Sequence, residues 1–269
     1  MNQLPGIKLR ADKMPGHWLL ARLGKRVLRP GGLAMTQGLL RDLAISKEDC
    51  VVELAPGLGL TAHLILEAGP QSYIGIERDR NAADWTSRRL PDVPHVSVQV
   101  GSANKTGLGD SCASIVLGEA MLSMNSPEHK QQIMEEAFRV LRPGGRYAIH
   151  ELLIVPDDVP AHVKQDIDDT LSAAIHVGAR PLTEEEWRIC LKYAGFTIDK
   201  VSHAPMNLLR PARLFADEGF WRALRFIRNV IFDGDSRRRV LMMRRTFHKH
   251  RAHLRAISII ARKAPEASK

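Results

Sequence analysis

The sequence predicts an α/β protein built on a Rossmann-like, doubly wound sheet with helices on both faces. From about residue 50 to 155, short runs rich in β-branched residues alternate with longer amphipathic segments. The runs are almost continuously apolar, which is typical of parallel strands covered on both faces. Because strand, helix and strand follow one another with short links, the pattern indicates a doubly wound sheet.

The elements can be assigned in chain order. Two short helices separated by Pro30-Gly31-Gly32 are expected in residues 17–44. Five strands are then expected, at residues 50–55, 72–77, 95–100, 113–117 and 146–154. Three helices are expected between them, at residues 60–68, 81–90 and 127–141. The third of these places its apolar residues three and four positions apart, which gives it one face to bury.

The remaining elements follow the same reasoning. A helix is expected at 161–175, and another at 184–193, where Thr183 and Glu186 have the spacing of a capping box and Gly195 follows the end. Strands at 196–201 and 256–261 complete a seven-stranded sheet whose last strand is expected to be antiparallel. A basic helical stretch lies between these two strands.

One heptapeptide occurs twice, as Arg26–Gly32 and as Arg139–Gly145. Proline removes the donor that a helix needs to continue, and glycine permits positive φ. We therefore interpret both copies as signals that end a helix. The sequences around the two copies differ, so they do not indicate a duplicated domain.

Composition excludes several classes of protein. The 269 residues are 44% hydrophobic and contain no apolar run of the length that a membrane span requires. The formal charge of +9 is uneven, because residues 201–269 hold 16 Lys+Arg and 5 Asp+Glu. The three widely spaced cysteines and the absence of a long apolar run in the first six residues predict a cytoplasmic protein.

These patterns predict three regions. Residues 1–45 form an N-terminal helical cap, residues 46–205 and 254–264 form the cofactor-binding domain, and residues 206–253 form a basic helical insertion that shapes the substrate site. Within the insertion, residues 220, 224, 227 and 231 share one helical face, with Arg222, Arg225 and Arg228 elsewhere. We expect that apolar face to pack on the sheet domain and the arginines to be solvated.

A glycine loop at 56–62 connects the first strand to the first helix of the sheet domain. Glycines at positions 57 and 59 allow a sharp turn and bring backbone N–H groups close to a ligand at the helix N-terminus. The loop also fits the G-x-G-x-x-A pattern of dinucleotide binding, and Glu77 could hold ribose hydroxyls in either cofactor class. An NAD-dependent oxidoreductase therefore remains an alternative at this point.

Three ordered motifs resemble the class I S-adenosylmethionine-dependent methyltransferases. Residues 53–59, Glu-Leu-Ala-Pro-Gly-Leu-Gly, resemble the first motif of that family. Gly75-Ile76-Glu77 resembles the second, and residues 139–145 resemble the segment before strand five. The closest similarity is to the small-molecule group that includes quinone-biosynthesis and arsenite methyltransferases, over roughly residues 35–205 and the last strand.

The resemblance implies S-adenosylmethionine as cofactor and assigns roles to named residues. Glu53 is expected to orient the loop through the cofactor's amino group, and Glu77 to accept hydrogen bonds from both ribose hydroxyls. The remaining cofactor-binding residues are Ala55, Gly57 and Gly59 at the methionine end, Ser102 and Ala103 at the adenine, and Glu119 at the junction with the substrate. The sequence departs from the family in two places, since Ala55 replaces the first glycine and Ser102 replaces an acidic residue.

The resemblance to methyltransferases and the basic insertion also imply what chemistry and which partners to expect. Methyl transfer depends mainly on near-attack geometry, so no catalytic triad is expected. Glu119, Glu151 and His176 are the candidates for a catalytic role, and no metal site is expected. The acceptor is expected to be a small molecule, acidic or amphiphilic, with contact to an anionic membrane surface as a second role for the basic insertion.

An RNA methyltransferase is the nucleic-acid alternative. Strand four ends in Gly118-Glu119-Ala120-Met121, which lacks the Asn-Pro-Pro-aromatic signature of amino-group methylation. Aromatic residues for base stacking make up only 5% of the chain. We therefore expect a small-molecule acceptor in preference to a nucleic acid and keep an RNA methyltransferase that uses the basic C-terminal segment as the alternative.

Overall fold

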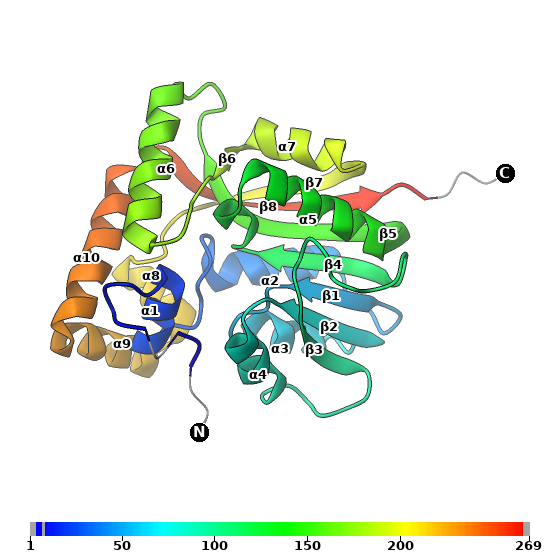
Figure 1. The fold of residues 1–269 in the computed structure, drawn as a ribbon, viewed down its shortest axis with the longest axis horizontal. Coiled ribbons are helices and arrows are strands. Elements are labelled where there is room, and N and C mark those ends of the chain that lie inside the picture. Colours follow the sequence, from blue (N-terminus) through cyan, green and yellow to red (C-terminus); the bar gives the residue numbers. More distant parts are fainter. Residues whose placement is uncertain (1–3, 7–8, 266–269) are drawn as a thin grey trace.

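The protein is built on a single twisted sheet (Figure 1). The computed structural model describes residues 4–6 and 9–265; residues 1–3, half of the N-terminal stretch considered above, lie outside this part. The strand order is β3-β2-β1-β4-β5-β8-β7, and β6 pairs with β5 beside this path. The strands are β1 (Cys50–Leu54), β2 (Ser72–Glu77), β3 (Val96–Val100), β4 (Ala113–Glu119), β5 (Leu141–Ile154), β6 (Leu182–Thr183), β7 (Phe196–Pro205) and β8 (Leu254–Lys263).

Ten α-helices surround the sheet in the described residues. They are α1 (Gly16–Leu23), α2 (Gly32–Leu43), α3 (Leu60–Glu67), α4 (Arg80–Ser87), α5 (Pro127–Val140), α6 (Ala161–Ile175), α7 (Glu184–Tyr193), α8 (Pro211–Glu218), α9 (Phe220–Phe232) and α10 (Gly234–Lys249). A short 3₁₀ turn, η1 (Leu122–Met124), precedes α5. None of the described helices is both long and apolar enough to cross a membrane.

The predicted fold class is confirmed. β1 to β5 are parallel, and β8 lies antiparallel between β5 and β7, as expected for the last strand. The sheet has one strand more than the seven predicted, because the two-residue β6 is too short to produce a periodic pattern. The capping box on α7 is present, since Glu186 N–H donates to the Thr183 hydroxyl and the Glu186 carboxylate accepts from Thr183 N–H.

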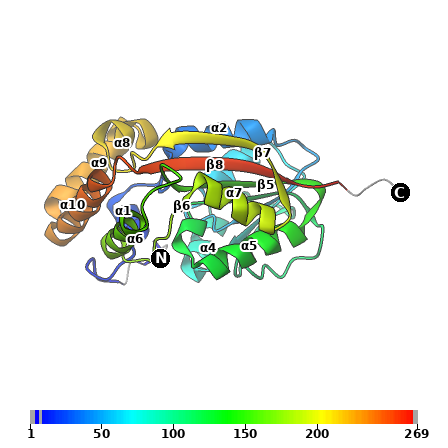
Figure 2. The same cartoon turned by 90° about the horizontal axis from the view of Figure 1, so that it is seen from above.

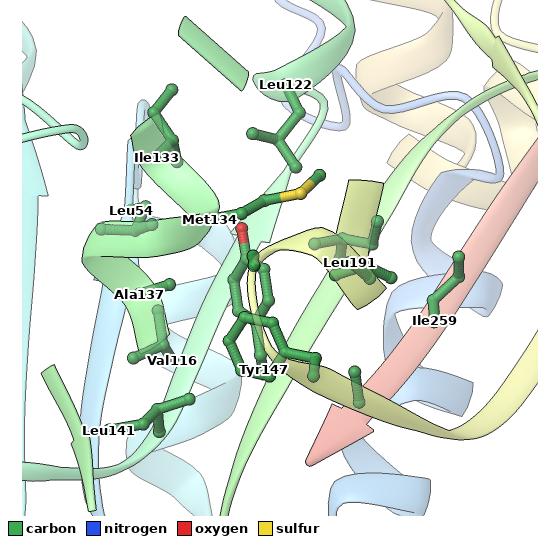
Figure 3. Close-up of a cluster of buried hydrophobic side chains, with 14 of the residues drawn as sticks. Leu54, Val116, Leu122, Ile133, Met134, Ala137, Leu141, Tyr147, Leu191 and Ile259 are labelled. Carbon is green, nitrogen blue, oxygen red and sulfur yellow. The ribbon is translucent and has the colours of Figure 1, made fainter. Parts of the chain in front are cut away.

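Successive strand residues point to opposite faces of the sheet, and each face has its own core. Val52, Leu54 and Tyr147 belong to a cluster with α5 and α7, part of which is drawn in Figure 3. Val51 and Tyr73 belong to a second cluster, with α2 and α3. The polar residues near the strand ends follow the same alternation, which decides their partners.

A layer of helices covers the end of the sheet at which the parallel strands finish (Figures 1 and 2). The helices α1, α6, α9 and α10 contact one another there and share a hydrophobic cluster with Leu214 of α8. By contrast, α2 packs on β5 and β8. The two helices of the N-terminal segment therefore have different surroundings, while the boundaries of the three regions remain predictions.

Two expectations from the sequence are wrong. The second copy of the heptapeptide spans the end of α5, at Val140, but the first copy lies before a helix, because α1 already ends at Leu23 and α2 begins at Gly32. Gly24, with φ +110°, supplies the left-handed residue that ends α1. Proline and glycine thus begin a helix at the first copy, which local sequence alone does not distinguish from ending one.

The prediction of which face of α9 is buried is also wrong. Ala223 and Phe226 are buried against the neighbouring helices, and Ile227 is half-buried. Phe220, Leu224 and Ile231 of the predicted buried face are instead 58%, 40% and 55% exposed. The neighbours of α9 are α1, α8 and α10 rather than the sheet. These helices cover only part of the apolar surface of α9.

Candidate active site

A cavity of about 710 Å³ opens at the carboxyl ends of the parallel strands. This is where open α/β sheets bind ligands, and the volume lies within the roughly 300–1,000 Å³ of small-molecule and cofactor sites. Seven of the eight residues expected to bind the cofactor line the cavity. They are Glu53, Ala55, Gly57, Glu77, Ser102, Ala103 and Glu119; Gly59 is not among the lining residues, although its neighbour Leu60 is.

The glycine loop has the backbone conformation that its sequence predicts. Gly57 and Gly59 adopt φ of +59° and +76°, and Gly59 is the N-terminal cap of α3. A Cβ at Gly59 would lie 2.7 Å from Cγ2 of Thr86, whereas a Cβ at Gly57 would meet only Ala55 O, at 3.9 Å. The backbone at Gly57 is therefore open to a ligand, and Gly59 provides the close packing of the loop.

Ala55 also has a positive φ, of +56°, at the position where the resembling family has glycine. For an L-residue this conformation costs roughly 1–2 kcal/mol. Ala55→Gly is therefore expected to raise the free energy of unfolding by about 0.5–1 kcal/mol, after allowing for the greater freedom of glycine in the unfolded chain. Urea unfolding measures the change.

Ala68→Gly is the matched control for this prediction. Ala68 is exposed and has φ −76°, which alanine adopts without strain. Glycine there should lower the free energy of unfolding by about 0.5–1 kcal/mol. Equal effects of the two substitutions would show that Ala55 is not strained.

Glu77 connects the loop to the second strand. Its carboxylate accepts hydrogen bonds from the backbone N–H groups of Gly57, at 3.1 Å, and Asp79, at 2.9 Å. Burial raises the pKa of Glu77, while these two bonds oppose the shift. Glu77 therefore holds the glycine loop in place and also borders the cavity.

Ser102 and Ala103 follow β3 and border the same cavity. The Ser102 hydroxyl lies 2.5 Å from Oδ1 of Asn104 and donates to it. The serine that stands where the resembling family has an acid is thus already engaged within its own turn.

Glu53 is buried at the end of β1, 4% exposed, and also borders the cavity. Burial raises the pKa of Glu53 to about 8; the neighbouring Glu119 and Glu77 add to this, while the hydrogen bond from Tyr73 and the charge of Arg29 oppose it. The Tyr73 hydroxyl donates to Glu53 at 2.6 Å. In the free protein the Glu53 carboxyl is therefore mostly protonated at pH 7.

Glu119, at the end of β4, lies at the centre of a polar cluster. Its Oε1 accepts from the Thr36 hydroxyl at 2.6 Å and from His150 Nδ1 at 2.8 Å. Its Oε2 accepts from the Thr61 hydroxyl at 2.5 Å and from the Arg29 guanidinium. Arg29 and these donors hold the pKa of Glu119 far below its usual range, despite its burial.

The tautomer of His150 follows from its second contact. Gly31 N–H donates to His150 Nε2 at 3.0 Å, so this nitrogen accepts and the proton resides on Nδ1. Both oxygens of Glu119 are therefore fully engaged by donors. Glu119 lines the cavity as a fixed anion and is not free to remove a proton from a substrate.

Sequence reasoning did not place the other members of this cluster next to Glu119. His150 pairs in register with Glu119 in the parallel β4–β5 ladder, so the two side chains point to the same face. That register could have been inferred from the two strands. Arg29 and Thr36 come from an N-terminal segment whose position no local pattern indicates. His17 of α1 also lines the cavity, where its side chain is exposed.

Two catalytic candidates lie away from the cavity. Glu151 points to the face opposite His150, where its carboxylate accepts from the backbone N–H groups of Met121, Leu122 and Ser123 at 2.8–3.0 Å. His176 is the exposed residue that caps α6. Neither is among the residues that line the cavity in the described part of the chain.

Glu151 is expected to act as a structural residue. Glu151→Gln replaces one acceptor oxygen by a donor and leaves at least one buried N–H of η1 without a partner. We expect the free energy of unfolding to fall by about 1–3 kcal/mol while cofactor affinity changes less than twofold. Urea unfolding and calorimetry measure the two quantities. A loss of turnover with unchanged stability and affinity would contradict this role.

The cavity changes character beyond the ends of β4 and β5. The lining residues contributed there by η1, β5, α6, α10 and the segment after β7 are mainly apolar. They are Met121, Met124, Leu152, Leu171, Ile175, Met206, Leu208, Met243 and Phe247. The carboxylates and the glycine loop thus occupy one part of the cavity, and an apolar compartment adjoins it.

The parallel sheet, with a cavity at the carboxyl ends of its strands, has the architecture of an enzyme that binds a nucleotide-type cofactor. Residues 52–149 match a family model described as a methyltransferase domain. The chain belongs to the class I S-adenosylmethionine-dependent methyltransferases. It is an S-adenosylmethionine-dependent methyltransferase, and S-adenosylmethionine is its cofactor.

The chain is also similar to proteins of other organisms. An uncharacterized protein of Haemophilus influenzae is 33% identical over 249 residues, which are 90% of this chain and 96% of that protein. The arsenite methyltransferase of Halobacterium salinarum is 27% identical over 171 residues, 61% of this chain and 41% of that enzyme.

Solved structures share the fold. A phosphoethanolamine N-methyltransferase 2 of Haemonchus contortus, in complex with S-adenosylhomocysteine, has a TM-score of 0.71 and 14% identity over 93% of this chain and 57% of its own. A putative sarcosine dimethylglycine methyltransferase of Galdieria sulphuraria has a TM-score of 0.67 and 18% identity over 86% of each chain. The methyl acceptors in the names of these two enzymes describe those enzymes and not this chain.

Proposed function

We propose that this enzyme methylates a small, amphiphilic acceptor that binds in the apolar compartment of the cavity. The observation that carries the proposal is the separation of the cavity into a polar part at β1–β3 and an apolar part beyond β4 and β5. An apolar compartment binds a ligand by burial of its surface, and a few polar groups set its orientation. Arg26, at the cavity lining, offers a positive charge to a polar or acidic head of the acceptor.

The residues of the polar part suit S-adenosylmethionine. A buried carboxyl at Glu53 matches a cationic amino group, and Glu77 presents an acceptor to ribose hydroxyls. Gly57 leaves open space at the loop backbone, and Ser102 and Ala103 border the opposite side. When bound, the cofactor supplies an activated methyl group on a sulfonium.

The chain itself positions the methyl donor and the nucleophile and excludes water from them. Methyl transfer is an in-line displacement, so alignment of donor and nucleophile supplies much of the rate. Glu119 and Arg29 hold the N-terminal segment over the cavity, and the apolar residues keep water from the acceptor. Asn125, which follows η1, and His129 of α5 are polar side chains at the cavity lining. We propose that the acceptor nucleophile reacts without a dedicated protein base.

The expected cytoplasmic location is part of this proposal. The three cysteines are unpaired in the structure, which suits a reducing compartment. The chain therefore has no disulfide among the described residues that reduction could break.

Calorimetry and a labelling experiment test the proposal. Wild-type protein is expected to bind S-adenosylmethionine and S-adenosylhomocysteine but not NAD, and Glu77→Ala to lose about a hundredfold in affinity. With methyl-labelled cofactor and a cell extract, label is expected in small molecules that partition into organic solvent. Label recovered in RNA or in protein would refute the proposed acceptor class, and NAD binding alone would refute the cofactor assignment.

A further inference from the structure

Most of the large hydrophobic side chains that α9 and α10 expose lie on α9. Among the described residues, eleven large hydrophobic side chains are exposed, and five of them lie on α9. These five, which we call the α9 outer face, are Phe220, Trp221, Leu224, Ile231 and Phe232. Trp221 and Phe232 are 80% and 83% exposed, and the ring contact of Trp221 is an edge contact with Phe220 of the same face. An exposed patch of this kind marks an interaction site.

Arginines border the α9 outer face. Arg222, Arg225 and Arg228 are exposed on the same helix. Four more are exposed on the adjacent α10, at positions 237, 238, 244 and 245. Residues 206–253 contain twelve Lys+Arg and four Asp+Glu, a formal charge of +8. Aromatic and aliphatic side chains surrounded by arginines have the composition of a helix that lies in the headgroup region of a membrane.

The charge also decides between occupants of the face. If a second copy of this chain covered it symmetrically, the arginines of the two copies would be brought together and would repel one another. Single-stranded nucleic acid would satisfy the arginines, but it would leave Leu224 and Ile231 without an apolar partner. An anionic phospholipid surface satisfies both the charges and the apolar side chains.

We propose that the α9 outer face docks the enzyme peripherally on membranes that contain anionic phospholipids. The helix lies parallel to the surface, with Trp221 and Phe232 among the headgroups and the arginines at lipid phosphates. α9 packs on α1 and α10, both of which also line the cavity. Docking therefore places the helical layer around the apolar compartment next to the membrane. Docking of α9 on a membrane is independent of which molecule accepts the methyl group.

The test is flotation of the purified full-length protein with vesicles. We expect the protein to float with vesicles of phosphatidylcholine containing about one third phosphatidylglycerol, and not with phosphatidylcholine alone. High salt should weaken binding because it screens the arginines. Trp221→Ser together with Phe232→Ser should reduce binding at least about tenfold. Arg222→Gln, Arg225→Gln and Arg228→Gln combined should do the same.

Tyr193→Ser is the matched control, because Tyr193 on α7 is also 80% exposed but lies outside the basic region. It should bind vesicles as the wild type does. Trp221→Phe should keep binding but lose the vesicle-dependent blue shift of tryptophan fluorescence, since the chain has four tryptophans and only this one is on α9. Unchanged binding of S-adenosylmethionine by every variant separates loss of docking from loss of folding.

Three results would overturn the inference. Absence of binding to anionic vesicles, or equal binding to neutral ones, would show that the α9 outer face does not dock on anionic membranes. A dimer in solution that dissociates on Trp221→Ser and Phe232→Ser would assign the face to a second copy. Binding of RNA that depends on the three α9 arginines, without vesicle binding, would assign it to nucleic acid.

Discussion

Arg29→Met is expected to lower the free energy of unfolding by about 3–5 kcal/mol, measured by urea unfolding. The substitution removes the cation that faces Glu119 and leaves an anion in a site where both side chains are only 8% exposed. Thr36, Thr61 and His150 still donate to Glu119, but none of them supplies a charge when His150 is neutral. The cost of burying an unpaired charge therefore exceeds what the remaining hydrogen bonds provide.

Lys249→Met is the matched control. Lys249 forms an ion pair with Asp166 in which the two side chains are 55% and 48% exposed, so its loss should cost less than about 1 kcal/mol. The double variant Arg29→Met with Glu119→Gln should recover much of the stability, because it removes both charges. If Arg29→Met cost no more than Lys249→Met, the pair would not be what holds the N-terminal segment on the sheet.

Binding of S-adenosylmethionine is expected to release a proton from Glu53. The carboxyl is protonated below about pH 8 in the free protein, whereas a cationic amino group beside it favours the ionised form. Affinity should therefore fall about tenfold for each pH unit below 8 and level off above it. Calorimetry in buffers of different ionisation enthalpy measures both the affinity and the proton released.

Two variants test the assignment to Glu53. Glu53→Gln should bind the cofactor without this pH dependence. Tyr73→Phe removes the hydrogen bond that stabilises the ionised carboxylate, so the midpoint should move to a pH above 8. A pH dependence that neither variant alters would place the titrating group elsewhere. In the free wild type, the raised pKa also makes the free energy of unfolding fall as pH rises from about 4.5 to about 8.

The conformation of the glycine loop could be predicted because it depends on local features. A strand, two glycines at positive φ and a helix N-terminus are contiguous in sequence, and Glu77 ends the next strand. The capping box of α7 is similarly local. For these elements the backbone preference of a few neighbouring residues and their hydrogen bonds are sufficient.

The cluster around Glu119 could be predicted only in part. Strand alternation separates His150 from Glu151 and sends them to opposite faces, so their different roles follow from register. The sequence did not indicate that Arg29 and Thr36, more than eighty residues away along the chain, would engage the same carboxylate. The position of Glu119 at the end of a strand therefore predicts a role in chemistry, whereas its contacts make it a fixed anion.

By itself, the sequence determined the class of fold, the cofactor loop and the location of the positive charge. These depend on periodicity, glycine positions and composition, which neighbouring residues carry. Only the tertiary structure decided which face of α9 is buried, because a helix with apolar residues on most of its circumference can turn either side inward. Its partners are α1, α8 and α10, and their surface covers Ala223 and Phe226 while leaving Trp221 and Phe232 exposed. Burial is a property of the assembled helices, and periodicity within one helix does not specify it.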